Sequence, residues 1–123
     1  MTIKEVSEKY NISQDTLRYY ERVGMIPPIT RTAGGIRDYE EKDCDWIENS
    51  ICMRNAGVPV EVIIEYVQLF FEGDETIPAR LQLLADQKVE LMKQKEQIEK
   101  MIDRLDYKIG RYEEAVKTGK LVW

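Results

Sequence analysis

The chain has 123 residues, 43% of them hydrophobic and 33% charged, so it is too apolar for a disordered chain and too charged for a membrane protein. Histidine is absent, which excludes His-dependent catalytic triads and His-containing metal sites, and two cysteines do not make a disulfide framework. No apolar run approaches the ~20 residues that span a bilayer, and residues 1–5 lack a signal-peptide pattern, so we expect a cytoplasmic protein without a membrane partner.

The net charge of −5 argues weakly against nucleic-acid binding, because domains that bind nucleic acid are often basic. The distribution of charge points the other way. Residues 14–37 contain four arginines and two acids, namely Arg18, Arg22, Arg31, Arg37, Asp15 and Glu21. A basic strip on an acidic body can still bind phosphates, because the field at a groove depends on the charges close to it.

The N-terminal residues predict two short helices. Thr2 and Glu5 have the spacing of a capping box, and the first helix ends near Asn11, a residue that tolerates the left-handed conformation. Ser13 begins a second helix, which Gly24 ends. Two short helices joined by a turn of three or four residues form a helix-turn-helix.

Residues 29–39 predict a small β-hairpin. Pro27 and Pro28 forbid further helix, and β-prone residues then flank Gly34 and Gly35. Residues 1–39 are therefore expected to form a winged helix-turn-helix unit.

Residues 40–75 predict a second unit of two helices. Its first helix runs from Glu40 to about Ala56, with acidic residues in the first turn that suit the helix dipole, and Gly57 stops it. Pro59 suits the first position of the next helix, which ends at Gly73.

Residues 76–116 predict one long helix with a coiled-coil seam. Apolar residues recur every seven positions, and a partly filled second stripe, interrupted by Lys88 and Lys95, runs beside them. A solvated helix is the alternative, but five heptad positions in register favour dimerisation. The predicted dimer interface consists of Leu84, Leu91, Ile98, Ile102, Leu105, Ile109 and Tyr112. Residues 117–123 form a tail whose last three residues either dock or fray.

The second helix and the hairpin are the strongest candidates for DNA contact. Arg18 and Arg22 lie four residues apart on one helical face that suits a major groove. Arg31 and Arg37 flank the glycine tip, from which they would reach neighbouring phosphates or a minor groove. The predicted DNA-contacting residues of these elements are Gln14, Thr16, Arg18, Tyr19, Arg22, Arg31 and Arg37. An ion pair with nearby acid is the alternative role of Arg22.

Residues 12–26 resemble the signature of the MerR family of bacterial transcription regulators. The similarity includes the run Arg18-Tyr19-Tyr20-Glu21-Arg22, continues through Pro28, Arg31 and residues 35–39, and resumes at residues 54–57. At matching positions the resemblance adds Tyr20, Ile36, Tyr39 and Arg54 to the expected DNA-binding residues. A core position is an equal alternative for Tyr20, since it lies near the stripe of Leu17 and Val23.

The resemblance implies a mainly α-helical fold and a mode of action. The long helices of a homodimer would pair antiparallel, and the dimer would bind a near-palindromic promoter element. It would distort an over-long promoter spacer on which RNA polymerase acts. Neither a cofactor nor a metal is implied.

Three segments resemble the NmlR/AdhR-like branch of the family, namely residues 35–39, 52–57 and 72–80. Many other members have Tyr where this chain has Ile36. The branch is associated with responses to reactive aldehydes and related electrophiles through a cysteine, and Cys52 matches the position of that cysteine. Metal-sensing relatives use a cysteine near the start of the long helix, and this chain has none after Cys52.

The two cysteines lie eight residues apart on one predicted helix, or ~12 Å along its axis, which excludes a disulfide between them within one chain. Cys44 shares a stripe with Ile47 and Ile51 and is expected in the core. Cys52 lies at the edge of that stripe, and spacing alone favours a buried structural role for it. The resemblance instead favours an electrophile sensor. The alternatives are a regulator that binds a small molecule non-covalently and, more distantly, a coiled-coil interaction module. No catalytic constellation is present.

Overall fold

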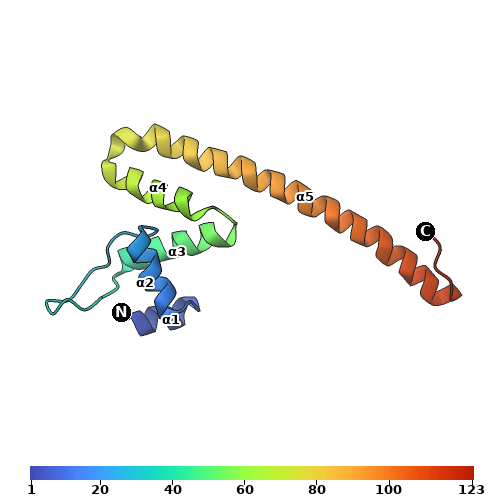
Figure 1. Ribbon diagram of the computed structural model, residues 1–123, viewed down its shortest axis with the longest axis horizontal. Coiled ribbons are helices and arrows are strands. Elements are labelled where there is room, and N and C mark those ends of the chain that lie inside the picture. The colour runs from blue at the N-terminus through green and yellow to red at the C-terminus, as the bar shows by residue number, and fades with distance from the viewer. The chain divides into compact units, whose positions relative to one another are not determined.

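The computed structural model describes residues 1–123 and is mainly α-helical, as predicted (Figure 1). The elements are α1 (Ile3–Tyr10), α2 (Gln14–Val23), α3 (Glu41–Asn55), α4 (Val60–Glu72), the 3-10 turn η1 (Asp74–Thr76) and α5 (Ile77–Thr118). The chain divides into two compact units, residues 1–85 and 86–123. No helix is both long and apolar enough to cross a membrane.

The helix-turn-helix forms where local sequence predicts it. The Thr2 side chain accepts a bond from the Glu5 amide at 3.1 Å, and the Glu5 carboxylate accepts one from the Thr2 amide at 2.9 Å. These bonds hold the pKa of Glu5 below its usual value. Asn11 ends α1 in the left-handed conformation, Ser13 caps α2, and Gly24 ends α2 at a φ of 88°. The predicted helix boundaries are confirmed.

The predicted hairpin is reduced to one antiparallel bridge between Arg31 and Arg37. Inside it, the Thr32 amide donates to the Ile36 carbonyl at 2.8 Å, and Gly35 turns at a φ of 81°. No ladder extends from this bridge, because residues 31–36 are all exposed and an isolated two-stranded hairpin is only marginally stable. We call residues 30–38 the wing.

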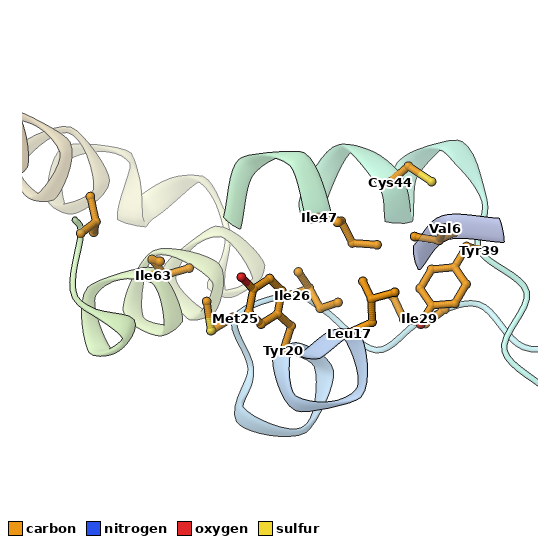
Figure 2. Close-up of a cluster of buried hydrophobic side chains, with 11 residues drawn as sticks. Val6, Leu17, Tyr20, Met25, Ile26, Ile29, Tyr39, Cys44, Ile47 and Ile63 are labelled. Atoms are coloured by element: carbon orange, nitrogen blue, oxygen red, sulfur yellow. The ribbon is translucent and has the colours of Figure 1, made fainter. Parts of the chain in front are cut away.

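One hydrophobic core joins α1, α2, α3 and α4 (Figure 2). Val6, Leu17 and Ile47 are fully buried and point toward one another. Ser50 on α3 donates to the Met25 carbonyl at 2.6 Å, so a polar group inside this core is satisfied. The core therefore holds α2 in a fixed place on the first unit.

The ends of the second pair of helices lie within one residue of their predicted positions. Helix α3 begins at Glu41, one residue later than predicted, because Glu40 is its N-cap and forms a capping box with Asp43. Acidic residues lie in its first turn and Gly57 follows it, as expected. Pro59 lies at the N-cap of α4 rather than at its first helical position, and the helix begins at Val60. A helix still forms there because a proline at either position leaves no intrahelical hydrogen bond unmade.

Helix α5 has 42 residues, and none of them is buried. After it, the chain turns at Gly119 and folds back along the last turns. Arg111 Nε donates to the Val122 carbonyl at 2.6 Å, and Tyr107 donates to the Trp123 carbonyl at 3.0 Å. The Trp123 ring lies edge-on to Tyr112. The tail therefore docks on its own helix.

Candidate nucleic-acid interface

The outward face of α2 carries the predicted groove-reading side chains. Arg18 is exposed and donates from Nη1 to Asp15 Oδ1 at 3.0 Å, and its Nη2 lies 3.5 Å from Gln14 Oε1. Asp15 is almost fully exposed, so this ion pair is solvated and easily exchanged for another acceptor. Arg18 can thus turn toward a base edge at little cost in free energy.

The same face continues with Arg22 and Tyr19. The Arg22 guanidinium lies over the Tyr19 ring, 5.5 Å from its centroid, and both side chains are exposed. Arg22 forms no ion pair with a nearby acid, so the alternative role suggested for it by the sequence is not observed. Its positive charge is not offset within the protein. Thr16 is half-buried, and its hydroxyl lies 2.8 Å from that of Ser13, so it forms part of the helix cap.

The two wing arginines meet one carboxylate of α2. Arg37 Nε donates to Glu21 Oε1 at 2.8 Å, and Arg31 Nη2 lies 3.8 Å from Glu21 Oε2. Arg31 Nη1 also donates to the Gly35 carbonyl at 3.0 Å. The wing and α2 are therefore one connected surface.

Two residues expected at the DNA are instead core residues. Tyr20 lies beside Met25 and Ile26 in the core, and Tyr39 is only 2% exposed. Burial raises the pKa of both hydroxyls. Both side chains point into the shared core rather than toward solvent.

The remaining predicted contacts are exposed. Ile36, at the wing tip, is 70% exposed. Arg54 lies in the last turn of α3, where its Nη1 donates to the Val58 carbonyl at 2.9 Å. Arg54 thus belongs to a different element from the α2–wing surface.

The cysteines differ sharply in environment. Cys44 is buried in the core beside Val6, as predicted, and Cys52 is exposed on α3. The expectation from spacing alone, that Cys52 is buried, is wrong, because Cys52 lies one 100° step from the half-buried Ile51, at the edge of the buried stripe. The Cys52 thiol is therefore open to a reagent in solution.

Sequence reasoning did not assign a role to Glu21. In the sequence it is one of two acids among four arginines, yet its carboxylate contacts Arg31, Arg37 and the Ile29 amide. Those partners lie 8 to 16 residues further along the chain, so no periodic pattern reveals them. One available signal was an acid standing alone among the arginines of residues 18–37.

Comparison with known proteins agrees with this geometry. The sequence model of the family "MerR HTH family regulatory protein" matches residues 1–69. The transcriptional regulator AdhR of Bacillus subtilis is 52% identical over 92 residues, which cover 75% of this chain and 66% of AdhR. A transcriptional regulator of Haemophilus influenzae is 31% identical over 120 residues, which cover 98% of this chain and 89% of that protein.

Two crystal structures are similar over nearly the whole chain. A MerR family transcriptional regulator from Listeria monocytogenes is 43% identical, with a TM-score of 0.91 and coverage of 97% of this chain and 90% of its own. HiNmlR, a MerR family regulator lacking the sensor domain and bound to promoter DNA, is 31% identical, with a TM-score of 0.87 and coverage of 97% and 94%. The chain therefore belongs to the MerR family of helix-turn-helix transcription regulators, in its NmlR/AdhR-like branch.

Proposed function

We propose that this DNA-binding regulator acts as a homodimer that places α2 in the major groove of promoter DNA and the wing on the adjacent backbone. The observation that carries this proposal is the single surface formed by Arg18 and Arg22 on α2 with Arg31 and Arg37 on the wing. Arginine is suited to both jobs, since its planar fork binds guanine edges and phosphates in pairs of hydrogen bonds.

The homodimer is supported by the exposed seam of α5. Ile98, at its centre, is 61% exposed in the single chain, and Leu105 and Ile109 are about as exposed. Two neighbouring rows of large apolar side chains at heptad spacing need a partner, and a second copy presents the same rows.

Charge favours antiparallel pairing of these helices. Lys88 and Lys95 interrupt the seam in its first half, whereas Glu99, Asp106 and Glu113 follow seam residues in its second half. Parallel pairing would stack each lysine on its own copy. Antiparallel pairing brings the first half of one helix against the second half of the other, so neither lysine faces its own copy.

Such a dimer presents two copies of the α2–wing surface to DNA. A two-fold axis in the protein calls for a near-palindromic element with two half-sites, as the family resemblance implies. We infer that the dimer distorts the promoter between these half-sites and so changes how RNA polymerase uses it.

The test of this proposal is footprinting on the chain's own promoter region. We expect protection of two symmetric half-sites and an affinity that falls steeply as salt rises, because arginines release counterions from phosphates. Protection without two-fold symmetry, or binding that is insensitive to salt, would contradict it.

The proposed effector is a reactive aldehyde or a related electrophile, sensed by Cys52. Exposure of this thiol and burial of Cys44 support the assignment, as does the association of the branch with such responses. With an α,β-unsaturated aldehyde, the Cys52 thiolate forms an S–C bond at the β-carbon. The displaced π electrons reach the α-carbon, which takes up a proton, so no oxidant or leaving group is needed.

Intact-protein mass spectrometry after exposure to acrolein tests this step. We expect one adduct on folded protein, located on Cys52 by peptide mapping, and a second on Cys44 only after unfolding. An adduct on Cys44 alone would overturn the assignment.

A non-covalent ligand is the second candidate, and an apolar hollow of about 400 Å³ favours it. Pro27, Pro28, Val67 and Phe71 line this hollow between the end of α2 and α4. If Cys52 remains unmodified while a small apolar compound alters promoter binding, this candidate replaces the thiol sensor.

A further inference from the structure

We propose that Glu21 is a positioning residue for DNA recognition, which holds both legs of the wing at a fixed place relative to α2. It does not itself contact DNA, and it acts through Arg31 and Arg37. The inference rests on the proposed placement of these two arginines at the DNA, and it goes further by assigning their geometry to one carboxylate.

Both oxygens of Glu21 accept hydrogen bonds from groups in the wing or directly before it. Oε1 accepts from Arg37 Nε at 2.8 Å. Oε2 accepts from the Ile29 amide at 2.9 Å and lies 3.8 Å from Arg31 Nη2. Ile29 precedes the wing and Arg37 lies on its returning leg, so the carboxylate joins the last turn of α2 to both legs.

The environment of the carboxylate makes these bonds effective. The Glu21 side chain is only 12% exposed, and that of Arg37 is 26% exposed, so water screens the pair less than it screens Arg18 and Asp15. Charge-assisted hydrogen bonds in such surroundings are short and directional.

The wing needs this support because it has little rigidity of its own. Its two legs are joined by one bridge, and the residues between them are exposed. Without an anchor, the separation between Arg37 and the Arg18 face of α2 would vary, and ordering it at the DNA would cost conformational entropy. With the anchor, the two sets of arginines reach neighbouring positions on the duplex at a set spacing.

The geometry also leaves the arginines available for phosphate. The Arg37 bond uses Nε, so the terminal amino groups of the guanidinium remain free to donate to a DNA phosphate. Two arginines and one glutamate leave a net charge of +1 at this cluster. Glu21 thus fixes the direction of the two arginine side chains, while the net positive charge of the cluster still attracts DNA.

The experiment compares Glu21→Gln and Glu21→Asp with Asp15→Asn. Gln keeps the length and removes the charge, whereas Asp keeps the charge and shortens the reach. Asp15→Asn is the matched control, because it removes an arginine-paired carboxylate from the same helix without touching the wing. Binding is measured to an operator duplex, selected by the wild-type protein from a random library, and to a scrambled duplex.

We expect both Glu21 variants to bind the operator about tenfold more weakly while binding to the scrambled duplex falls little. Hydrogen exchange should speed up in the free protein at the Thr32 and Asp38 amides, which donate across the wing to the Ile36 and Thr30 carbonyls. Asp15→Asn should strengthen binding to both duplexes slightly. The contrary outcome is that Glu21→Gln strengthens binding to both duplexes in the way that Asp15→Asn does, while Glu21→Asp binds like wild type. Glu21 would then contribute charge alone, and the inference would be overturned.

Arg37→Gln separates the inference from the proposed function. If this variant binds the operator like wild type, the proposed wing contact fails. If Arg37→Gln weakens binding but the Glu21 variants do not, only the inference fails. Should Glu21→Gln not fold, the Glu21→Asp and Arg37→Gln double-mutant cycle decides, since positioning predicts losses that do not add.

Discussion

Residues 1–85 bury a continuous cluster of apolar side chains from four helices, whereas no residue of α5 is buried in the single chain. The first unit carries its own core, and that core places α2. The seam of α5 has no such core and leaves large apolar side chains on its surface, including Ile98, Ile102 and Leu105. From this contrast we expect the first unit to be stable within a single chain. We expect the order of the second unit to depend on the pairing of two chains.

The largest expected effect comes from damage to the core of the first unit. Leu17→Ala removes a fully buried side chain of α2 and should lower the free energy of unfolding by about 2–5 kcal/mol, because a cavity remains. Chemical denaturation followed by circular dichroism measures this loss. Val116→Ala, at a residue 84% exposed, is the control and should change little at high protein concentration.

The second-largest effect is expected at the seam of α5. Ile98→Asp places a charge without a partner in the proposed interface, where desolvation of a polar group costs roughly 2 kcal/mol or more. Sedimentation should show monomers, and operator binding should be lost with the dimer. Val89→Asp adds the same charge on α5 outside the seam and should remain dimeric. A fully dimeric Ile98→Asp protein would place the interface elsewhere.

Arg18→Ala tests the surface that the first core supports. Loss of a bidentate base contact should cost about 1–3 kcal/mol of operator binding, with no change in the melting temperature. Fluorescence anisotropy with the operator and a scrambled duplex measures it, and Lys100→Ala on α5 controls for loss of one positive charge. A loss equal on both duplexes would make Arg18 a phosphate contact.

The smallest expected change in DNA affinity is at the cysteines. Cys52→Ala should keep operator affinity and abolish the transcriptional response to aldehyde, because the sensing thiol is gone. Cys44→Ala should keep the response and lose only about 1 kcal/mol of stability, as a small core side chain is trimmed. A reporter strain and thermal unfolding measure the two effects. A full response in the Cys52→Ala strain would contradict the thiol sensor and favour a non-covalent ligand in the apolar hollow between the end of α2 and α4.

Local sequence predicts the helices well because their ends depend on neighbours along the chain. The capping box of Thr2 and Glu5, the cap at Ser13 and the glycine at residue 24 are all recognisable without a fold. The heptad row of α5 is likewise a property of spacing alone. These features need no contact between distant residues.

The tertiary structure alone decided what depends on packing between elements. Tyr20 and Tyr39 follow the family pattern for DNA contacts, but the shared core draws their rings inward. Cys52 is exposed, whereas spacing alone favours a buried role, because packing between helices decides how much of α3 is covered.

Glu21 shows the same division most clearly. Its two oxygens find partners across 8 to 16 residues of chain, and only the folded wing brings those partners within 4 Å. Sequence by itself determined the helices, the charge distribution and the family of this protein. The fold decided which arginines are held, and by what, because ion pairs between distant residues follow from three-dimensional proximity rather than from order along the chain.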